Sequence, residues 1–122
     1  MAKILVVDDS ETQRFQIKKA LQTAGYEVIE AVDGQEGLQK LEGDAGIGLI
    51  LCDVNMPVMD GLTMCTKLNE KGSHAGVPIF MLTTESSNEL KEAGKKVGVR
   101  AWIIKPYVAE KLLAAIEKVI KK

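Results

Sequence analysis

Cysteine, histidine and aromatic residues are scarce in this chain of 122 residues, which has two Cys, one His and 4% aromatic residues. Cys52 and Cys65 form no CxxC pair, have no Cys or His at metal-ligand spacing, and lie in apolar segments. We therefore expect reduced thiols in the core rather than a disulfide or a zinc site. His74 lies in a loop with Gly and Ser, and we assign it no role.

The sequence also lacks a long apolar run and an excess of charge of one sign. Its first apolar run ends at Asp8, too early for a signal peptide or for a spanning helix of about 20 apolar residues. Because 16 Lys and Arg balance 17 Asp and Glu, nucleic acid is not an expected partner. We expect a cytoplasmic protein with no membrane partner, and one domain over residues 1–122 with no attached output domain.

Short apolar runs rich in branched residues predict five strands. Four runs are mostly unbroken, as strands covered on both faces require, at residues 4–7, 49–52, 79–82 and 102–104. The fifth, at residues 27–31, is interrupted by glutamates and is typical of an edge strand.

Helical patterns follow each of these runs. The first four begin at residues that can cap a helix, namely Ser10 with Gln13, Asp33, Asp60, and Ser86 with Glu89. The fourth carries an apolar stripe that we expect to face the core, at Leu90, Ala93, Gly94 and Val97. Strict alternation of strand and helix predicts a parallel sheet in a three-layer α/β domain.

Polar side chains follow four of the five expected strands: Asp8 and Asp9, Asp53, Thr83, and Lys105. Parallel strands place their carboxyl ends along one edge, and open α/β sheets bind ligands there, where the strand order reverses. The strand at 27–31 contributes no such group, which suits an outer position in the order 2-1-3-4-5. The two acidic clusters would then be neighbours.

Three carboxylates in one crevice require a cation. Two unit charges about 4 Å apart repel by about 4 kcal/mol at an effective dielectric of about 20. Oxygen ligands without His or Cys suit Mg²⁺, which also binds phosphate oxygens. Lys105 adds a positive charge, and a carboxylate can act as the nucleophile. Together these groups predict phosphoryl transfer.

The chain resembles a known family, the receiver domains of response regulators, and within it the CheY-like single-domain receivers of the chemotaxis type. The resemblance spans the whole chain. It rests on four motifs in order: Val6-Val7-Asp8-Asp9, Asp53-Val54-Asn55-Met56-Pro57 with Asp60-Gly61, Thr83-Thr84-Glu85, and Lys105-Pro106. It implies a flavodoxin-like (βα)5 fold, for which the order 2-1-3-4-5 is already known. It also implies a two-component signalling protein rather than an enzyme.

By this resemblance, Asp53 accepts a phosphoryl group from the phosphohistidine of a histidine kinase, and Lys105 contacts that group. The implied Mg²⁺ is bound directly by Asp9 and Asp53, through water by Asp8, and by the backbone carbonyl of Asn55.

The resemblance also implies a conformational switch and a limited lifetime of the phosphoryl group. The hydroxyl of Thr83 moves toward the phosphate, and Trp102, where the family more often has Tyr or Phe, follows it from outside to inside. Asn55 and Glu85 border the path of the hydrolytic water, which predicts a short-lived phosphoryl group that the protein removes itself. The peptide bond between Lys105 and Pro106 is expected to be cis.

The expected output is binding to a partner protein, such as the flagellar motor switch, by a monomer that a phosphatase can also act on. A stand-alone phosphorelay intermediate or a phosphate sink are alternatives. A pseudo-receiver that takes no phosphate is a third. A Mg²⁺-dependent aspartyl-phosphate phosphohydrolase is disfavoured, because Asn55 stands where such enzymes carry a second Asp as general acid.

Overall fold

The computed structural model describes residues 2–72 and 76–120, so that His74 lies outside the described residues. Strands and helices alternate throughout. In chain order they are β1 (Lys3–Val7), α1 (Glu11–Thr23), β2 (Glu27–Ala31), α2 (Gly34–Gly43), β3 (Ile47–Cys52), α3 (Gly61–Lys71), β4 (Ile79–Thr83), α4 (Asn88–Lys96), β5 (Val99–Ile104) and α5 (Ala109–Val119). Within the described residues, none of these helices has the length and apolar character needed to span a membrane.

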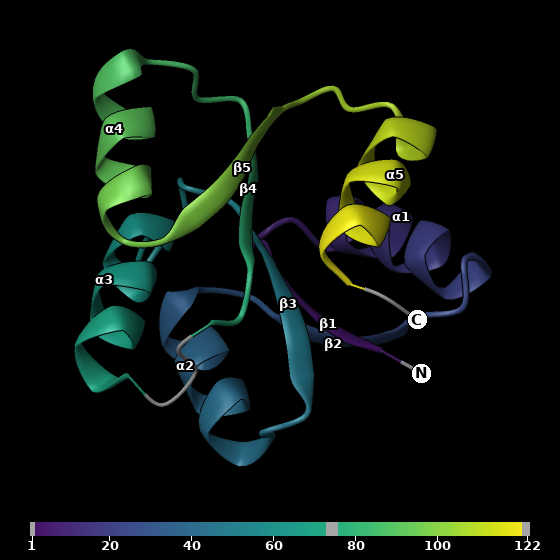
Figure 1. The fold of residues 1–122 in the computed structure, drawn as a ribbon, viewed down its shortest axis with the longest axis horizontal. Coiled ribbons are helices and arrows are strands. Elements are labelled where there is room, and N and C mark those ends of the chain that lie inside the picture. Colours follow the sequence, from purple (N-terminus) through teal and green to yellow (C-terminus); the bar gives the residue numbers. More distant parts are fainter. Residues whose placement is uncertain (1, 73–75, 121–122) are drawn as a thin grey trace.

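The five strands form one parallel sheet in the order β2-β1-β3-β4-β5, which confirms the predicted fold class and order. Figure 1 shows α1 and α5 on one face of the sheet and α2, α3 and α4 on the other. The prediction for the last strand was partly wrong. β5 begins at Val99 and lies at the second edge of the sheet, so it is half-buried rather than covered on both faces.

Two apolar cores lie on either side of the sheet, because successive residues of a strand point to opposite faces. One, the α1/α5 core, includes Ile4, Val6, Ile17, Leu21, Leu112 and Ile116. The other, the α2–α4 core, includes Leu5, Val7, Leu41, Met64, Cys65 and Cys52. Both cysteines are free and buried, as expected, and burial raises the pKa of Cys65 to about 12.

Three of the four predicted helix caps are confirmed. The side chains of Ser10, Asp33 and Asp60 accept backbone N–H bonds at the starts of α1, α2 and α3. The fourth was wrong. Ser87, not Ser86, caps α4, because its hydroxyl accepts from Leu90 N at 3.2 Å and the helix begins one residue later than expected.

The predicted apolar stripe of α4 is also only partly buried. Gly94 is buried where α4 packs against β5, whereas Ala93 is exposed to solvent.

Candidate functional site

The backbone at the carboxyl edge of the sheet is fixed by hydrogen bonds that continue the strand ladders. Asp8 N donates to Ala31 O at 3.1 Å, and Asp53 N donates to Val7 O at 3.0 Å. Lys105 N donates to Thr83 O at 2.8 Å. The three residues that follow β1, β3 and β5 are therefore brought to one edge, as predicted from the sequence.

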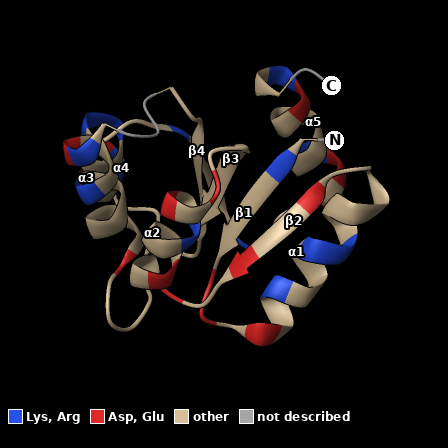
Figure 2. Cartoon of the chain, turned by 90° about the horizontal axis from the view of Figure 1, so that it is seen from below, with Lys and Arg blue, Asp and Glu red and all other residues tan. Residues whose placement is uncertain are grey.

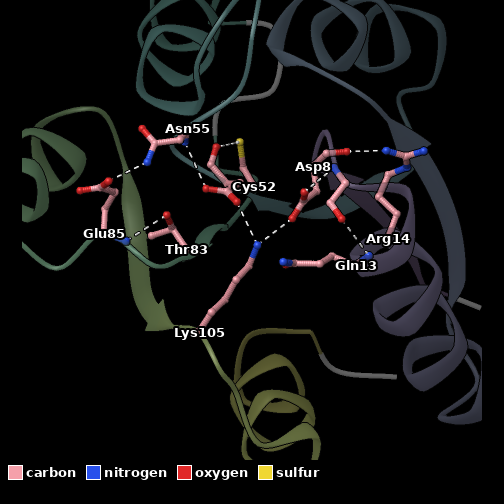
Figure 3. Close-up of polar contacts among 10 residues, drawn as sticks. Asp8, Gln13, Arg14, Cys52, Asn55, Thr83, Glu85 and Lys105 are labelled. Atoms are coloured by element: carbon pink, nitrogen blue, oxygen red, sulfur yellow. Dashed lines mark hydrogen bonds and ion pairs between the residues drawn. The ribbon is translucent and has the colours of Figure 1, made fainter.

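Lys105 lies between two carboxylates at this edge (Figure 3). Its Nζ donates to Asp8 Oδ2 and to Asp53 Oδ2, each at 2.9 Å. The side chains of Lys105, Asp8 and Asp53 are 8%, 4% and 12% exposed. Burial opposes the charge on Lys105, but its hydrogen bonds to the two carboxylates and their negative charge outweigh that effect, and its pKa is raised. One ammonium is thus shared by two carboxylates, so that one negative charge among these three groups stays unbalanced.

The acidic loop after β1 has a further anchor that the sequence did not reveal. Arg14 of α1 donates from Nη1 to the backbone carbonyl of Asp8 at 2.7 Å, and from Nε to Glu30 Oε1 at 3.2 Å. Asp8 Oδ1 accepts from Ser10 N at 2.9 Å. No spacing along the chain relates Arg14 to the acid pair, because the contact depends on how α1 leaves the loop. Arg14 holds the peptide group of Asp8 in place.

The loops after β3 and β4 are joined by side chains. Asp53 Oδ1 accepts from Asn55 N at 3.1 Å, and Asn55 Nδ2 donates to Glu85 Oε1 at 2.7 Å. Glu85 N in turn donates to Thr83 Oγ1 at 3.3 Å, and Thr83 is fully buried. The four residues form one chain of hydrogen bonds beside Lys105, visible in Figure 3.

Trp102 and Asp9 complete the set that the sequence predicted. Trp102 of β5 is half-buried against the α2–α4 core, and its Nε1 donates to the backbone carbonyl of Glu85 at 2.7 Å. Asp9 is exposed and forms no hydrogen bond or ion pair with the residues that the structure describes. Of the predicted site residues, Asp9 alone is therefore not tied to the others by such a bond within the described ranges.

The turn that follows Asp53 is closely packed. A Cβ on Gly61 would lie 2.2 Å from Asp53 O, so only glycine fits at the start of α3. Val58 has a φ of 68°, and Met59 N donates back to Pro57 O at 2.7 Å. At the other side of the site, the Lys105–Pro106 bond is cis, as expected.

The residues at this edge fit Mg²⁺ in their chemistry. The expected donors are carboxylates and one backbone carbonyl, and Mg²⁺ prefers oxygen ligands. The red parts of the ribbon in Figure 2 mark Asp and Glu residues at the end of β2, in the turn after β1 and at the start of α1. Among the described residues, however, no three side chains of His, Cys, Asp or Glu are grouped as a metal centre. Lys105 is the cation that contacts Asp8 and Asp53 in this structure, and it offsets one of their two negative charges.

The fold and the site define a class of protein: the chain belongs to the response regulator receiver domain family, which matches residues 4–117. Its relatives include chemotaxis proteins. The chain is 39% identical over 119 residues to the chemotaxis protein CheY1 of Helicobacter pylori, over 97% of this chain and 96% of that protein.

Solved structures agree. The crystal structure of Vibrio cholerae chemotaxis protein CheY4 matches with a TM-score of 0.92 and 43% identity, over 98% of this chain and 99% of that chain. A chain in the CheX–CheY–BeF3–Mg²⁺ complex of Borrelia burgdorferi matches with a TM-score of 0.90 and 26% identity, over 99% and 90%. The protein described here is thus a CheY-like receiver domain, which is a signalling protein and not an enzyme in the usual sense.

Proposed function

We propose that this receiver domain is a phosphorylation-activated switch of a two-component system, in which Asp53 accepts a phosphoryl group from a histidine kinase. The observation that carries the proposal is the placement of the Asp53 carboxylate, with Oδ2 on Lys105 and Oδ1 on Asn55 N. Of the two acids paired with Lys105, Asp53 is the more exposed, at 12% against 4% for Asp8. A phosphodonor can therefore reach the Asp53 carboxylate more easily than that of Asp8.

In the transfer, a carboxylate oxygen of Asp53 forms a bond to phosphorus while the bond from phosphorus to the kinase histidine breaks. The electron pair of that bond stays on the imidazole nitrogen, and an acyl phosphate results. The Lys105 ammonium, which now neutralises a carboxylate, then neutralises phosphoryl oxygen instead. Lys105 is already held at this position by Asp8.

Mg²⁺ is the proposed cofactor. The residues that would hold it are Asp9 and Asp53 directly, Asp8 through water, and Asn55 through its backbone carbonyl. When bound, the ion supplies positive charge to the phosphoryl oxygens as charge builds up on them. The all-oxygen donor set supports this assignment, as does the occurrence of Mg²⁺ in the complex of the Borrelia relative.

The switch follows from new hydrogen bonds to the phosphoryl group. Thr83 Oγ1 accepts from Glu85 N in this structure, and a phosphoryl group on Asp53 gives the hydroxyl hydrogen of Thr83 a charged acceptor. Each charge-assisted bond contributes about 1.5–3 kcal/mol, and a shift from 1:99 to 99:1 takes about 5.5 kcal/mol. Two or three new contacts by Thr83 and Lys105 are therefore sufficient, and Trp102 is the residue that transmits the change.

Self-dephosphorylation is assigned to Asn55 and Glu85. Their side chains meet at 2.7 Å on the solvent side of Asp53, where a water must approach the phosphorus. An amide and a carboxylate can both orient that water. This arrangement supports a short-lived phosphoryl group.

The output is proposed to be the binding of a partner protein by a single receiver domain, acting as a cytoplasmic monomer. Because the relatives are chemotaxis proteins, control of the flagellar motor switch is the favoured output, with a phosphatase as a second partner. A phosphorelay intermediate or a phosphate sink are the alternatives. Affinity capture of partners with and without beryllofluoride separates them, since motor control requires a motor protein that binds only the loaded form.

The phosphoacceptor is tested by mass spectrometry after incubation with Mg²⁺ and a phosphodonor, either acetyl phosphate or a histidine kinase with ATP. We expect one phosphoryl group on the wild type and none on Asp53→Asn. The matched control is Asp33→Asn, since Asp33 only caps α2 and Asn is an equally good cap. A phosphoryl group on Asp53→Asn would overturn the assignment, and an unmodified wild type would favour a pseudo-receiver. Sustained release of phosphate from a phosphomonoester would favour a phosphohydrolase.

A further inference from the structure

α4 contains a glycine at a position where the backbone conformation does not require one. Gly94 is buried, is followed by two more helical residues, and is not among the glycines with positive φ. Glycine in a helix interior lowers the folding equilibrium constant roughly fivefold relative to alanine. A side-chain contact must account for a glycine at this position.

That contact is with Trp102. A Cβ on Gly94 would lie 3.0 Å from Cζ3 and 3.4 Å from Cε3 of the indole, and 3.4 Å from Cβ of Val99. A distance of 3.0 Å is too short for two carbon atoms, which have their best contact at about 3.5–4.0 Å. The six-membered ring of Trp102 therefore packs against α4 at Gly94, and a larger residue at this position would require the ring or the helix to shift by a few tenths of an ångström. Figure 1 shows α4 alongside β5.

The opposite side of the same indole is also held. Its Nε1 donates to the carbonyl of Glu85 at 2.7 Å, so the ring is fixed by a hydrogen bond at one end and by contact with Gly94 at the other. Glu85 uses its other groups within the site, because its N–H donates to Thr83 Oγ1 and its carboxylate accepts from Asn55. Trp102 therefore acts on the residue that faces the phosphoacceptor loop.

We propose that Gly94 is a positioning residue: it seats the Trp102 indole against α4, and the seated indole fixes Glu85 against Asn55. This explains how a ring larger than Tyr or Phe is accommodated at this position of β5. The half-buried indole is held in this way while Lys105 still pairs with Asp53. The effect on phosphoryl lifetime rests on the proposed function. The packing of the Trp102 indole on Gly94, called the seat below, does not.

The seat is tested first without phosphate, with the variants Gly94→Ala, Trp102→Phe and the double variant. In the Trp102→Phe background the benzo ring is gone, so Gly94→Ala should raise the folding equilibrium constant up to about fivefold through helix propensity. In the wild-type background the same change should leave that constant unchanged or lower it. Equal effects in the two backgrounds, within the error of urea titrations, would overturn the proposal.

Because Trp102 is the only tryptophan, fluorescence reports the seat directly. Gly94→Ala should shift the emission to longer wavelength and increase quenching by acrylamide, since the half-buried indole loses its close contact with α4. The control is Gly43→Ala at the end of α2, where a Cβ would meet nothing within 4 Å. An unchanged spectrum in a folded Gly94→Ala protein would count against the seat.

The consequence for the site is measured as the decay of the phosphoryl group after the donor is removed. We expect Gly94→Ala to shift the decay rate at least twofold toward that of Glu85→Ala, and Gly43→Ala to leave it unchanged. A displaced indole with an unaltered decay rate would overturn the positioning role. If the wild type takes up no phosphoryl group, the proposed function fails, and the seat is judged by the stability cycle and the fluorescence.

Discussion

Lys105 donates to Asp53 across a distance of 2.9 Å, although 52 positions separate them in the sequence. The same Nζ also donates to Asp8 at 2.9 Å. All three side chains are almost buried, so their charges are poorly screened by water. The repulsion between the two carboxylates is relieved only while the lysine remains charged.

Removal of that charge should destabilise the metal-free protein. In EDTA at neutral pH, Lys105→Met leaves two close carboxylates without their shared donor, and we expect the free energy of unfolding to fall by about 2 kcal/mol. If the edge is the proposed metal site, Mg²⁺ should restore more stability to this variant than it adds to the wild type. The control is Lys3→Met, which breaks a more exposed pair with Asp44 and should cost much less. Equal losses in the two variants, measured by urea unfolding, would contradict the prediction.

The contacts of Lys105 with Asp8 and Asp53 also predict how the free energy of unfolding depends on pH. Folding raises the pKa of Lys105 above its ordinary value of 10.5, because the hydrogen bonds and charges of Asp8 and Asp53 outweigh burial. A base with a raised pKa stabilises the fold fully below its unfolded pKa, and this contribution is lost as pH rises through the folded pKa. The difference in unfolding free energy between wild type and Lys105→Met should therefore be constant up to about pH 10 and shrink above it. A difference that shrinks toward acid instead would show that the carboxylates govern it.

Arg14 should influence the proposed metal site without touching the metal. Its guanidinium holds the carbonyl of Asp8, and the loss of such an outer contact typically weakens metal binding about tenfold or more. We expect Arg14→Ala to weaken Mg²⁺ binding by about that factor, followed by titration of Trp102 fluorescence. Lys18→Ala is the matched control, because Lys18 pairs with the same Glu30 but not with Asp8. Unchanged affinity in Arg14→Ala would exclude this role.

Val58 stores backbone strain in the turn after Asp53. Its φ of 68° is unfavourable for a β-branched residue, and its side chain is 77% exposed, so little packing is lost on its removal. Val58→Gly should stabilise the protein by about 1 kcal/mol, measured as a higher urea midpoint at unchanged slope. Val32→Gly, at an exposed valine without positive φ, should stabilise nothing. A lower midpoint for Val58→Gly would show that the turn is not strained.

Much of this arrangement could be predicted from the sequence, because one rule places the carboxyl ends of parallel strands at one edge. That rule places Asp8, Asp53 and Lys105 together on the basis of the sequence alone. The rule does not predict contacts that depend on how helices pack against the sheet. Gly94 and Trp102 lie in different elements, and no periodicity relates a small residue in α4 to a large one in β5.

Local ambiguity explains the remaining errors. Ser86 and Ser87 are adjacent and both can cap a helix, so only the actual start of α4 distinguishes them. The apolar run in β5 resembles a covered strand, yet the edge position leaves Ile104 39% exposed. The role of Asp9 as a metal ligand is no such error and stays a prediction, because Asp9 is exposed and forms no hydrogen bond or ion pair with the described residues.

The bond between Lys105 and Asp8 spans 97 positions of the chain, which has a consequence for protein synthesis. The acid pair is made first, Asp53 follows, and the lysine is added only when most of the polypeptide exists. A nascent chain therefore carries all of these acids before it carries the lysine that pairs with Asp8 and Asp53. A prematurely terminated product could not complete the site, so the proposed acceptor would be fully formed only on chains whose translation had passed β5.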